Sequence, residues 1–264
     1  PILAVTATAT PPVVKDIQEK LLFQNGKVFQ KSFFRSNLSY EVYYEENKNE
    51  RILKICNENQ GTGIIYVRNR KKTREIAKFL IKNGISADFY HAGLTGEERD
   101  YKQSAWTSGK RRIMVSTNAF GMGIDKPDVR FVLHIDLPDC IEAYFQEAGR
   151  AGRDEKAAKC ILLYNNTDII QTDTQLQQSY PEKEFIKKIY SLLGNYFQIA
   201  VGAGENITFE FNISDFCESY SLNSIETYYS LAFLEKQGYI AISEAFHQPS
   251  KVLFTANKND LYKY

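Results

Sequence analysis

Residues 61–84 read GTGIIYVRNRKKTREIAKFLIKNG, in which a short apolar run is followed by a helical pattern. The run Ile64–Val67 is rich in β-branched side chains, which predicts a buried strand. Residues 72–82 carry apolar side chains on one helical face, and Asn83-Gly84 ends that helix. A strand followed directly by a helix is the repeating unit of parallel α/β sheets, so this stretch predicts that fold class.

The same alternation continues on both sides of this unit. Repeated β-α units imply a parallel sheet with flanking helices, in which ligands bind at the carboxyl ends of the strands. We expect this α/β domain over residues 31–165, while residues 1–30 hold the end of a preceding α/β unit and a linker. The other strands are predicted at residues 2–5, 85–90, 113–117, 131–135 and 159–164, and the other helices at residues 12–22, 96–108 and 139–150.

Residues 166–264 change in style and predict a second, smaller domain. A polar stretch with turn-forming residues, 165–175, marks the seam. Three helices are then followed by a hairpin, which is the element order of a winged helix, so we expect a winged-helix-like α+β domain. The helices are predicted at residues 183–197, 214–219 and 224–237, and the strands at residues 239–243 and 251–255.

The 264 residues carry 33 basic and 32 acidic side chains, a formal charge of +1. This balance excludes a strongly basic nucleic-acid tail and an acidic disordered chain. The net charge is nevertheless +6 through residue 165 and −5 after it, which suggests two units with different partners. No apolar run approaches the roughly 18–20 residues that span a bilayer, and the first residues, which lack a charged region and a cleavage site, are not expected to be a signal peptide. Because the chain begins inside an apolar strand without Met, we expect a piece of a longer protein.

The four cysteines, Cys56, Cys140, Cys160 and Cys217, lie far apart in the sequence. A structural zinc site needs closely spaced pairs of ligands, so no zinc site is predicted. Their number and spacing are typical of reduced, buried thiols in a cytoplasmic protein rather than of a disulfide framework.

Two glycine-containing segments are candidates for phosphate chemistry. Residues 115–125 end a strand in a loop with two glycines and a carboxylate, which fits either a phosphate approached by backbone N–H groups or a plain tight turn. Arg150 and Arg153 are three residues apart and would project the same way from a continuing helix turn, which suits bidentate phosphate contact. The alternative is a solvated arginine pair bridged to Glu147 or Asp154.

A third segment, residues 6–12, places small hydroxyl side chains and two prolines directly after a predicted strand. The hydroxyl groups could relay hydrogen bonds between neighbouring loops. They could equally cap the helix that starts near Pro12, and the residues alone favour this cap.

These segments share an order and spacing with known helicase motifs. Residues 5–10 (VTATAT) resemble motif III, residues 63–67 (GIIYV) the strand of motif IV, residues 90–94 (YHAGL) a marker that follows it, residues 116–125 motif V, and residues 146–153 (QEAGRAGR) motif VI. Together, over residues 1–165, they are similar to RecQ-family DNA helicases of superfamily two. The resemblance implies a second RecA-like lobe, the end of a first lobe, and ATP-dependent 3′→5′ unwinding.

The resemblance also implies roles at matching positions. Arg150 and Arg153 would be an arginine-finger pair that reaches an ATP bound mainly by the other lobe. Such fingers increase the rate of nucleotide hydrolysis by about 10³–10⁵-fold. Gln146 would line the same cleft as a third catalytic residue, and His134 resembles a framework histidine with a buried role. The residues expected to couple nucleotide to the cleft are Gly123, Asp125, Thr6 and Thr8. Those expected along single-stranded DNA, mainly on phosphates, are Arg68, Asn69, Arg70, His91, Thr117 and Asn118.

The sequence departs from the family's pattern in the elements that bind nucleotide and zinc. It contains no Gly-x-x-x-x-Gly-Lys-Ser/Thr loop and no Asp-Glu-x-His box, both of which belong to the first lobe. We therefore expect ATP and Mg²⁺ to be bound mainly by a lobe that precedes Pro1, and this fragment alone to be inactive. The family's four-cysteine zinc module is also missing, which predicts a zinc-free domain at residues 166–264.

The predicted winged helix is not typical of a DNA reader either. Its third helix offers Glu226 and Glu235 but only Lys236, so phosphates would repel it from a major groove. In the resemblance the wing hairpin splits the duplex, and the candidates near its tip are Phe246, His247 and Lys251. A packing or protein-binding module carries equal weight for this acidic domain.

The expected partners are single-stranded and partly duplex DNA, the missing lobe and a protein partner for the acidic domain, with no membrane. Two alternatives to a DNA helicase stay open. One is a non-enzymatic DNA-binding or docking module, and the other is an RNA helicase lobe.

Overall fold

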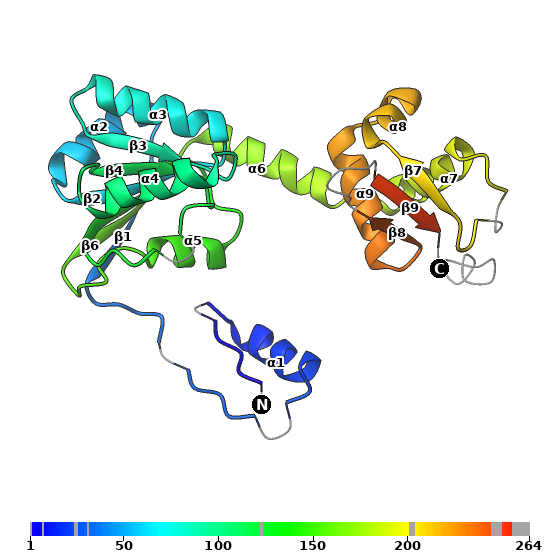
Figure 1. Cartoon of the computed structure of the whole chain (residues 1–264), viewed down its shortest axis with the longest axis horizontal. Coiled ribbons are helices and arrows are strands. Elements are labelled where there is room, and N and C mark those ends of the chain that lie inside the picture. The colour runs from blue at the N-terminus through cyan, green and yellow to red at the C-terminus, as the bar shows by residue number, and fades with distance from the viewer. Residues whose placement is uncertain are drawn as a thin grey trace. The chain divides into compact units, whose positions relative to one another are not determined.

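The computed structural model describes residues 2–6, 8–23, 26–30, 32–121, 124–200, 204–243 and 250–254 (Figure 1). The chain divides into two compact units, Pro1–Ile169 and Ile170–Tyr264. Each unit has an apolar core of its own.

The first unit is built on a six-stranded sheet in which all neighbouring strands run parallel. The strand order is β1-β6-β5-β2-β4-β3. The strands are β1 (Leu38–Tyr44), β2 (Thr62–Tyr66), β3 (Ala87–Tyr90), β4 (Ile113–Ser116), β5 (Val129–His134) and β6 (Ala158–Tyr164). The predicted parallel α/β sheet is therefore confirmed, and four consecutive residues of β2 are buried, as expected for a strand covered on both faces.

Helices cover both faces of this sheet (Figure 1). Ile65 of β2 shares a core cluster with Ile52 and Leu80, whereas the adjacent Ile64 belongs to a second cluster with Trp106. Because successive side chains of a strand point to opposite faces, the helices of Ile52 and Leu80 cover one face and that of Trp106 covers the other. The helices of this unit are α1 (Pro11–Lys20), α2 (Lys48–Glu58), α3 (Arg70–Lys82), α4 (Gly96–Thr107), α5 (Ile141–Ala148) and α6 (Asn166–Ser179), the last of which continues into the second unit.

Side-chain caps start the two helices that follow the carboxyl ends of β2 and β3. Asn69 accepts a hydrogen bond from Lys71 N at 2.7 Å and so caps α3. Thr95 and Glu98 form a reciprocal capping box at α4, with Glu98 N donating to Thr95 Oγ1 at 3.2 Å and Thr95 N donating to Glu98 Oε2 at 2.9 Å. Each cap turns the chain within a few residues of its strand end and keeps the connecting loops short.

Two local predictions are wrong in this unit. Residues 2–5 form no strand, because a strand needs a hydrogen-bonded neighbour and none pairs with them within the described ranges. The predicted seam at 165–175 contains the division between the two units, but it is helical rather than turn-like and forms most of α6. Asn165 and Asp168 start this helix by bonding each other's backbone N–H at 2.8 and 3.1 Å, a cap that outweighs the turn-forming composition.

β1 and α2 were not predicted from the sequence. β1 lies at the edge of the sheet and buries only Leu38, while its apolar residues Tyr40, Val42 and Tyr44 are exposed, so it has no buried apolar run that marks it as a core strand. α2 begins at Asn47, whose side chain accepts from Glu50 N, and buries Ile52, Ile55 and Cys56.

In its described residues, the second unit contains the end of α6, the helices α7, α8 and α9, and a three-stranded antiparallel sheet of order β7-β9-β8. Along the chain the elements are α7 (Lys183–Tyr196), β7 (Thr208–Phe211), α8 (Ile213–Tyr220), α9 (Ser224–Lys236), β8 (Ile240–Ser243) and β9 (Ser250–Phe254). The three predicted helices and the predicted hairpin are present, and β7 is an additional strand that pairs with β9. The winged-helix assignment stays a prediction, and two of its wing candidates, Phe246 and His247, lie outside the described residues.

In the described part of the chain, no helix combines the length and the apolar character needed to cross a bilayer.

Candidate functional site

A cleft of about 910 Å³ opens beside the turn that follows α5. It brings together residues from both ends of the first unit's sequence. Four of the predicted site residues line it, namely Gln146, Arg150, Arg153 and Thr8. Its other lining residues include Gly121, Arg35, Asn37, Tyr40, Phe34 and Phe145. The cleft therefore unites the predicted arginine pair with a segment before β1 to which the sequence analysis had assigned no role.

Arg150 and Arg153 both reach the loop that follows β4. Arg150 Nη1 donates to Gly121 O, and Arg153 Nη1 donates to Ile124 O and to Asp125 Oδ1 at 2.9 Å each. The expectation that both project from a continuing helix is wrong, because α5 ends at Ala148 and both arginines lie in the turns beyond it. They converge nevertheless, since each guanidinium is oriented by a carbonyl group of the same loop.

The alternative of an arginine pair bridged to Glu147 or Asp154 is also wrong. Glu147 instead contacts His134, with 2.8 Å between Oε2 and Nε2, and Asp154 pairs with Arg130. The carboxylate that does pair with Arg153 is Asp125, whose side chain is 85% exposed. An ion pair in such exposure is screened by water and contributes little, so it leaves the guanidinium free to exchange partners.

Gly121 is required by the close approach of Arg150. A Cβ atom placed on Gly121 would lie 2.1 Å from Arg150 Nη2 and 2.2 Å from Arg150 Cζ. The Tyr66 hydroxyl supports the same loop from beneath, donating to Phe120 O at 2.8 Å in a buried position. Arg150 Nε is itself buried and has no hydrogen-bond partner among the described residues. The loop thus packs against the Arg150 guanidinium. The Nε donor of this group has no acceptor in the described chain.

His134 lies behind the arginine turn and is buried, as predicted, with 1% of its surface exposed. Its ring stacks on Tyr66 with 5.2 Å between centroids and lies 4.9 Å from the ring of Tyr144. Burial raises the pKa values of the Tyr66 and Tyr144 hydroxyls, so both stay protonated and can act only as neutral groups. Tyr66 and Tyr144 pack in the core cluster that includes Phe120 of the loop, and neither lines the cleft.

Arg35 and Asn37 bond directly to the arginine turn, and the sequence analysis missed both. Arg35 donates to Gly149 O at 3.0 Å and also to Gly152 O. Asn37 Nδ2 donates to Gly152 O at 2.8 Å. The available signal was weak: a polar pair within residues 32–37, directly before a strand that was itself not recognised.

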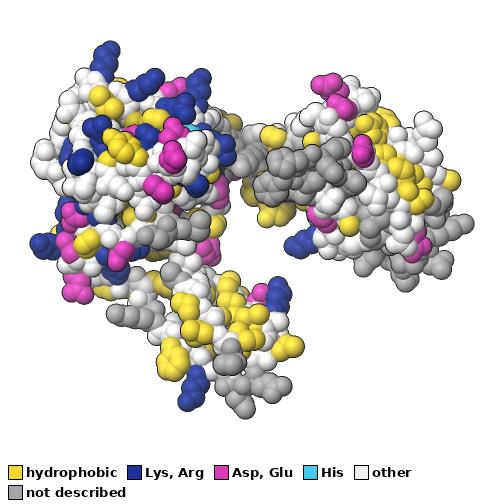
Figure 2. All heavy atoms as spheres, in the orientation of Figure 1, with side chains coloured by type: hydrophobic (Ala, Val, Ile, Leu, Met, Phe, Trp, Pro, Cys, Tyr) yellow, Lys and Arg dark blue, Asp and Glu magenta, His cyan; other side chains and the backbone are white. Residues whose placement is uncertain are grey.

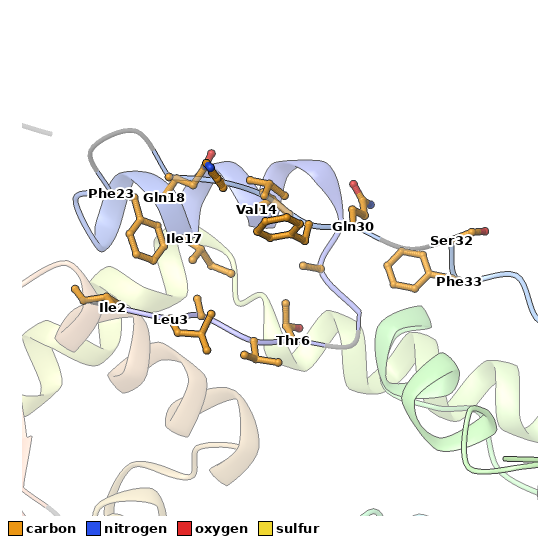
Figure 3. A pocket seen from close by; sticks show the side chains of 17 residues that line it. Ile2, Leu3, Thr6, Val14, Ile17, Gln18, Phe23, Gln30, Ser32 and Phe33 are labelled. Atoms are coloured by element: carbon orange, nitrogen blue, oxygen red, sulfur yellow. The ribbon is translucent and has the colours of Figure 1, made fainter.

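The two hydroxyl residues expected at the cleft are separated. Thr8 lines the cleft of Arg150, whereas Thr6 lines a different pocket of about 600 Å³ formed by residues 2–33. Figure 3 shows this second pocket, with Ile2 and Leu3 on one side and Ile17 and Phe23 on the other. Thr10 occupies the N-cap position of α1 without a side-chain cap bond, so the favoured capping role is not realised.

The predicted DNA-binding residues lie where β2, β3 and β4 end. These strands are neighbours in the order β2-β4-β3, so their carboxyl ends form one continuous edge. Arg68, Asn69, Arg70 and Asn118 are exposed there. His91 and Thr117 are instead 4% and 8% exposed, and their place along DNA stays a prediction. Their backbones take part in the loops of this edge, where Leu94 N donates to His91 O and Thr117 N donates to Tyr90 O.

Carboxylates hold the cations at this edge. Arg68 Nη2 bonds Asp139 Oδ1 at 2.8 Å, and Arg68 N donates to Asp136 Oδ2 at 3.0 Å. Lys72 pairs with the other oxygen of Asp136. Burial lowers the pKa of His91, and the positive charge of Arg74 lowers it further. The imidazole is therefore neutral near pH 7, and it carries no charge toward a phosphate.

The remaining predictions concern Gly123, Asp125 and the four cysteines. Gly123 lies outside the described residues, while Asp125 is exposed beside the cleft. All four cysteines are free, but Cys140 is exposed and accepts from Ala143 N at 3.4 Å as the N-cap of α5, which corrects the expectation of four buried thiols. Within the described ranges, no group of three or more His, Cys, Asp or Glu side chains could hold a metal ion.

The second unit has a groove of its own. Its volume is about 710 Å³, and it lies between α6, α8 and α9. Ile170, Ile225 and Tyr228 line this groove, and 64%, 50% and 54% of their surfaces are exposed. Its polar lining residues are Gln171, Thr174, Gln175, Gln178 and Ser224. This is a mostly apolar surface on the helix that the sequence analysis had judged unsuitable for reading DNA.

Comparisons with known proteins point to one family. The family model described as "Helicase conserved C-terminal domain" matches residues 47–155. The ATP-dependent DNA helicase RecQ of Bacillus subtilis is 40% identical over 196 residues, which cover 73% of this chain and 33% of that protein. The RecQ-like DNA helicase BLM of Xenopus laevis is 39% identical over 205 residues, covering 73% and 15%. ATP-dependent DNA helicase Q1 of Mus musculus is 41% identical over 181 residues, covering 66% and 28%. The chain spans a third or less of the length of these relatives.

Solved structures give the same architecture at lower identity. Saccharomyces cerevisiae Dbp5 bound to RNA and ADP BeF3 matches with a TM-score of 0.53 at 20% identity, over 66% of this chain and 47% of that one. At this identity the match shows only the fold, a RecA-like parallel sheet flanked by helices. The relatives at about 40% identity carry the family assignment, and their matches agree with the motif order found in the sequence. The chain therefore belongs to the RecQ family of helicases and contains its helicase C-terminal domain.

Proposed function

We propose that this chain supplies the second RecA-like lobe of an ATP-dependent 3′→5′ DNA helicase. The observation that carries the proposal is the presentation of Arg150 and Arg153 toward a cleft. Carbonyl groups of one loop hold both side chains, and the single carboxylate bonded to Arg153 is exposed. Two guanidinium groups held in this way are suited to donate to the oxygens of a phosphate chain.

The residues of this cleft fit a phosphate group. Arg150 Nε is a buried donor without a partner in the described chain, and Gly121, which has no Cβ atom, lets the guanidinium lie against its loop. Arg150 and Arg153 would stabilise the negative charge that develops on the outer phosphate, and Gln146 would offer its exposed amide to the same group. ATP, when bound, supplies the hydrolysis energy for unwinding. We assign the phosphate loop and Mg²⁺ to the partner lobe, and Asp125 and Gly123 to coupling between cleft and loop.

The edge formed by β2, β4 and β3 is proposed to hold single-stranded DNA. Arg68, Asn69, Arg70 and Asn118 are exposed at this edge and offer charge and hydrogen bonds to phosphates. His91 and Thr117, which are buried, support the loops of this edge. Figure 2 shows Lys and Arg side chains gathered over the upper part of this unit, where Figure 1 places α3.

Residues 2–33 are proposed to dock on the partner lobe. Leu3, Val5, Leu22 and Phe29 are more than 80% exposed, and Figure 2 shows hydrophobic side chains gathered around this part of the chain. An apolar surface of this kind marks a site of interaction. Residues 2–5, which have no strand neighbour in the described chain, would gain one by adding to the sheet of that lobe.

The test uses the full-length protein, in which this chain is joined to a lobe with a phosphate loop. We expect DNA-stimulated ATPase and unwinding from it, and no ATPase from residues 1–264 alone. Arg150→Ala and Arg153→Ala should each reduce kcat by about 10³-fold or more, without lowering the Tm. Full activity in both variants would contradict the arginine-finger assignment. Stimulation by RNA but not by DNA would favour the RNA helicase alternative.

For the second unit we propose a winged-helix-like domain that docks a protein rather than reading a major groove. The groove beside α9 favours this choice, because its wall is apolar and the unit is acidic overall. Tyr228→Glu in the full-length protein should leave DNA affinity unchanged. A tenfold loss of DNA affinity would instead place α9 on DNA.

A further inference from the structure

The turn that carries Arg150 is held from below by two side chains far away in the sequence. Gly149 O and Gly152 O flank Arg150 on either side along the chain. Arg35 Nη1 donates to the first at 3.0 Å, and Arg35 Nη2 donates to the second. One guanidinium group therefore bridges the two carbonyls on either side of the proposed finger.

Asn37 adds a second connection at the same place. Its Nδ2 donates to Gly152 O at 2.8 Å and to Lys156 O at 2.9 Å. Gly152 has φ +55°, and a Cβ atom there would lie 2.6 Å from Asn37 Nδ2. Only a glycine fits both the left-handed conformation and this close approach.

The backbone at both residues is itself tied to the start of the sheet. Ala158 N donates to Asn37 O at 2.9 Å, and Leu38 N donates to Arg35 O at 3.1 Å. Leu38 then pairs with Ala158 at the first register position of β1 and β6. The arginine turn is therefore connected to the sheet in two ways. The chain continues from the turn into β6, and Arg35 and Asn37 bond the turn to the segment that leads into β1.

We propose that Arg35 and Asn37 are positioning residues that set the direction of the Arg150 guanidinium. The inference rests on the proposed role of Arg150 at a nucleotide. A finger contributes only when its donors sit within a fraction of an ångström of the reacting phosphate, so the turn must not shift. Arg35 suits this role because its planar fork bonds two carbonyls at once in a fixed geometry, which the flexible ammonium group of a lysine does not provide.

A matched control exists in the same unit. Arg112 Nη1 donates to Cys56 O and Asn59 O at 2.9 Å each, so it also bridges two backbone carbonyls. This bridge closes the end of α2 and is not among the residues that line the cleft. Loss of Arg112 therefore measures what such a bridge contributes to folding alone.

The experiment compares Arg35→Ala, Arg35→Lys, Asn37→Ser and Arg112→Ala in the full-length protein. For each variant we would measure Tm, kcat and KM for ATP, and affinity for ADP and for ADP–aluminium fluoride. Arg35→Ala should lower kcat and ADP–aluminium fluoride affinity about 10–100-fold, with KM and ADP affinity within twofold of wild type. Asn37→Ser should lower kcat less, and Arg112→Ala should lower only Tm.

A double variant separates positioning from a general structural effect. In an Arg150→Ala background, Arg35→Ala should cause no further loss of ADP–aluminium fluoride affinity, because it acts through Arg150. An equal loss in both backgrounds would overturn the inference, as would a kcat within twofold of wild type for Arg35→Ala. If Arg35→Ala does not fold, Arg35→Lys is tested by the same criteria. We expect its kcat to lie between those of wild type and Arg150→Ala, and an unchanged kcat would overturn the inference. A wild-type protein without ATPase, or an active Arg150→Ala, would instead mean that the proposed function has failed.

Discussion

The arginines of the cleft and the arginines of the sheet edge are held in different ways. At the cleft, Arg150 and Arg153 are oriented mainly by backbone carbonyls. At the edge, Arg68 is paired with Asp139, and Lys72 with Asp136. A carbonyl orients a guanidinium without cancelling its charge, whereas a carboxylate neutralises it. Under the proposed function, the first group would stabilise developing charge and the second would exchange its carboxylate partners for a phosphate backbone.

Among the tests of this comparison, the largest effect is expected from a substitution of Gly121, which contacts Arg150 at the cleft. In Gly121→Ala the new Cβ atom would lie 2.1 Å from Arg150 Nη2, so the guanidinium must move away. We expect kcat of the full-length ATPase to fall about 100-fold, because a misplaced group loses most of its catalytic contribution. DNA affinity should not change.

Gly96→Ala is the control for this substitution, since nothing lies within 4 Å of a Cβ atom placed there. Its kcat should equal that of wild type. A normal kcat in Gly121→Ala would show that Arg150 does not need its present carbonyl partner.

A smaller effect is expected on the DNA side. Arg68→Ala should weaken binding of single-stranded oligonucleotides severalfold and lower the dependence of log Kd on log salt by about 0.7, the value for one phosphate contact. Asp139→Asn should act in the opposite direction, because it removes the carboxylate that competes for Arg68. Titrations at three salt concentrations measure both changes, and kcat at saturating DNA should stay constant. Weaker binding in Asp139→Asn would mean that this ion pair holds Arg68 in its binding position.

The smallest expected effect concerns pH. The pKa of His91 is lowered by burial and by the nearby Arg74 and Arg70. The unfolded chain therefore binds a proton near pH 6.5 while the folded chain does not, so His91 lowers stability as the pH falls below about 6.5. His91→Asn should reduce the loss of Tm between pH 7 and pH 5.5 relative to wild type. An identical loss in both proteins would show that His91 does not govern this range.

Much of the first unit was predictable because its signals are local. The buried run in β2 and the amphipathic pattern of α3 depend only on which residues are adjacent, and both elements were recognised. β1 was missed because an edge strand is recognised by its neighbour β6, not by its own pattern. α6 was missed because a cap formed by Asn165 and Asp168 overcame a composition typical of turns.

The candidate site divides along the same line. Arg150 and Arg153 were identified by their spacing and by a family motif. The predicted direction of their side chains assumed that the helix continues past them, whereas α5 ends at Ala148. Arg35 and Asn37 were not identified, since their partners lie more than 110 residues away. His91 was identified as a surface group and is buried, because solvent exposure depends on what packs above a strand end.

The sequence by itself therefore determined the parallel α/β class, the family and the identity of the two guanidinium groups, because short-range pattern and residue type are written along the chain. Folding alone decided where those groups point, which carbonyls hold them and which side chains lie beneath the surface. The physical reason is that hydrogen-bond partners and burial depend on distances in space, and residues 35 and 152 become neighbours only when β1 pairs with β6.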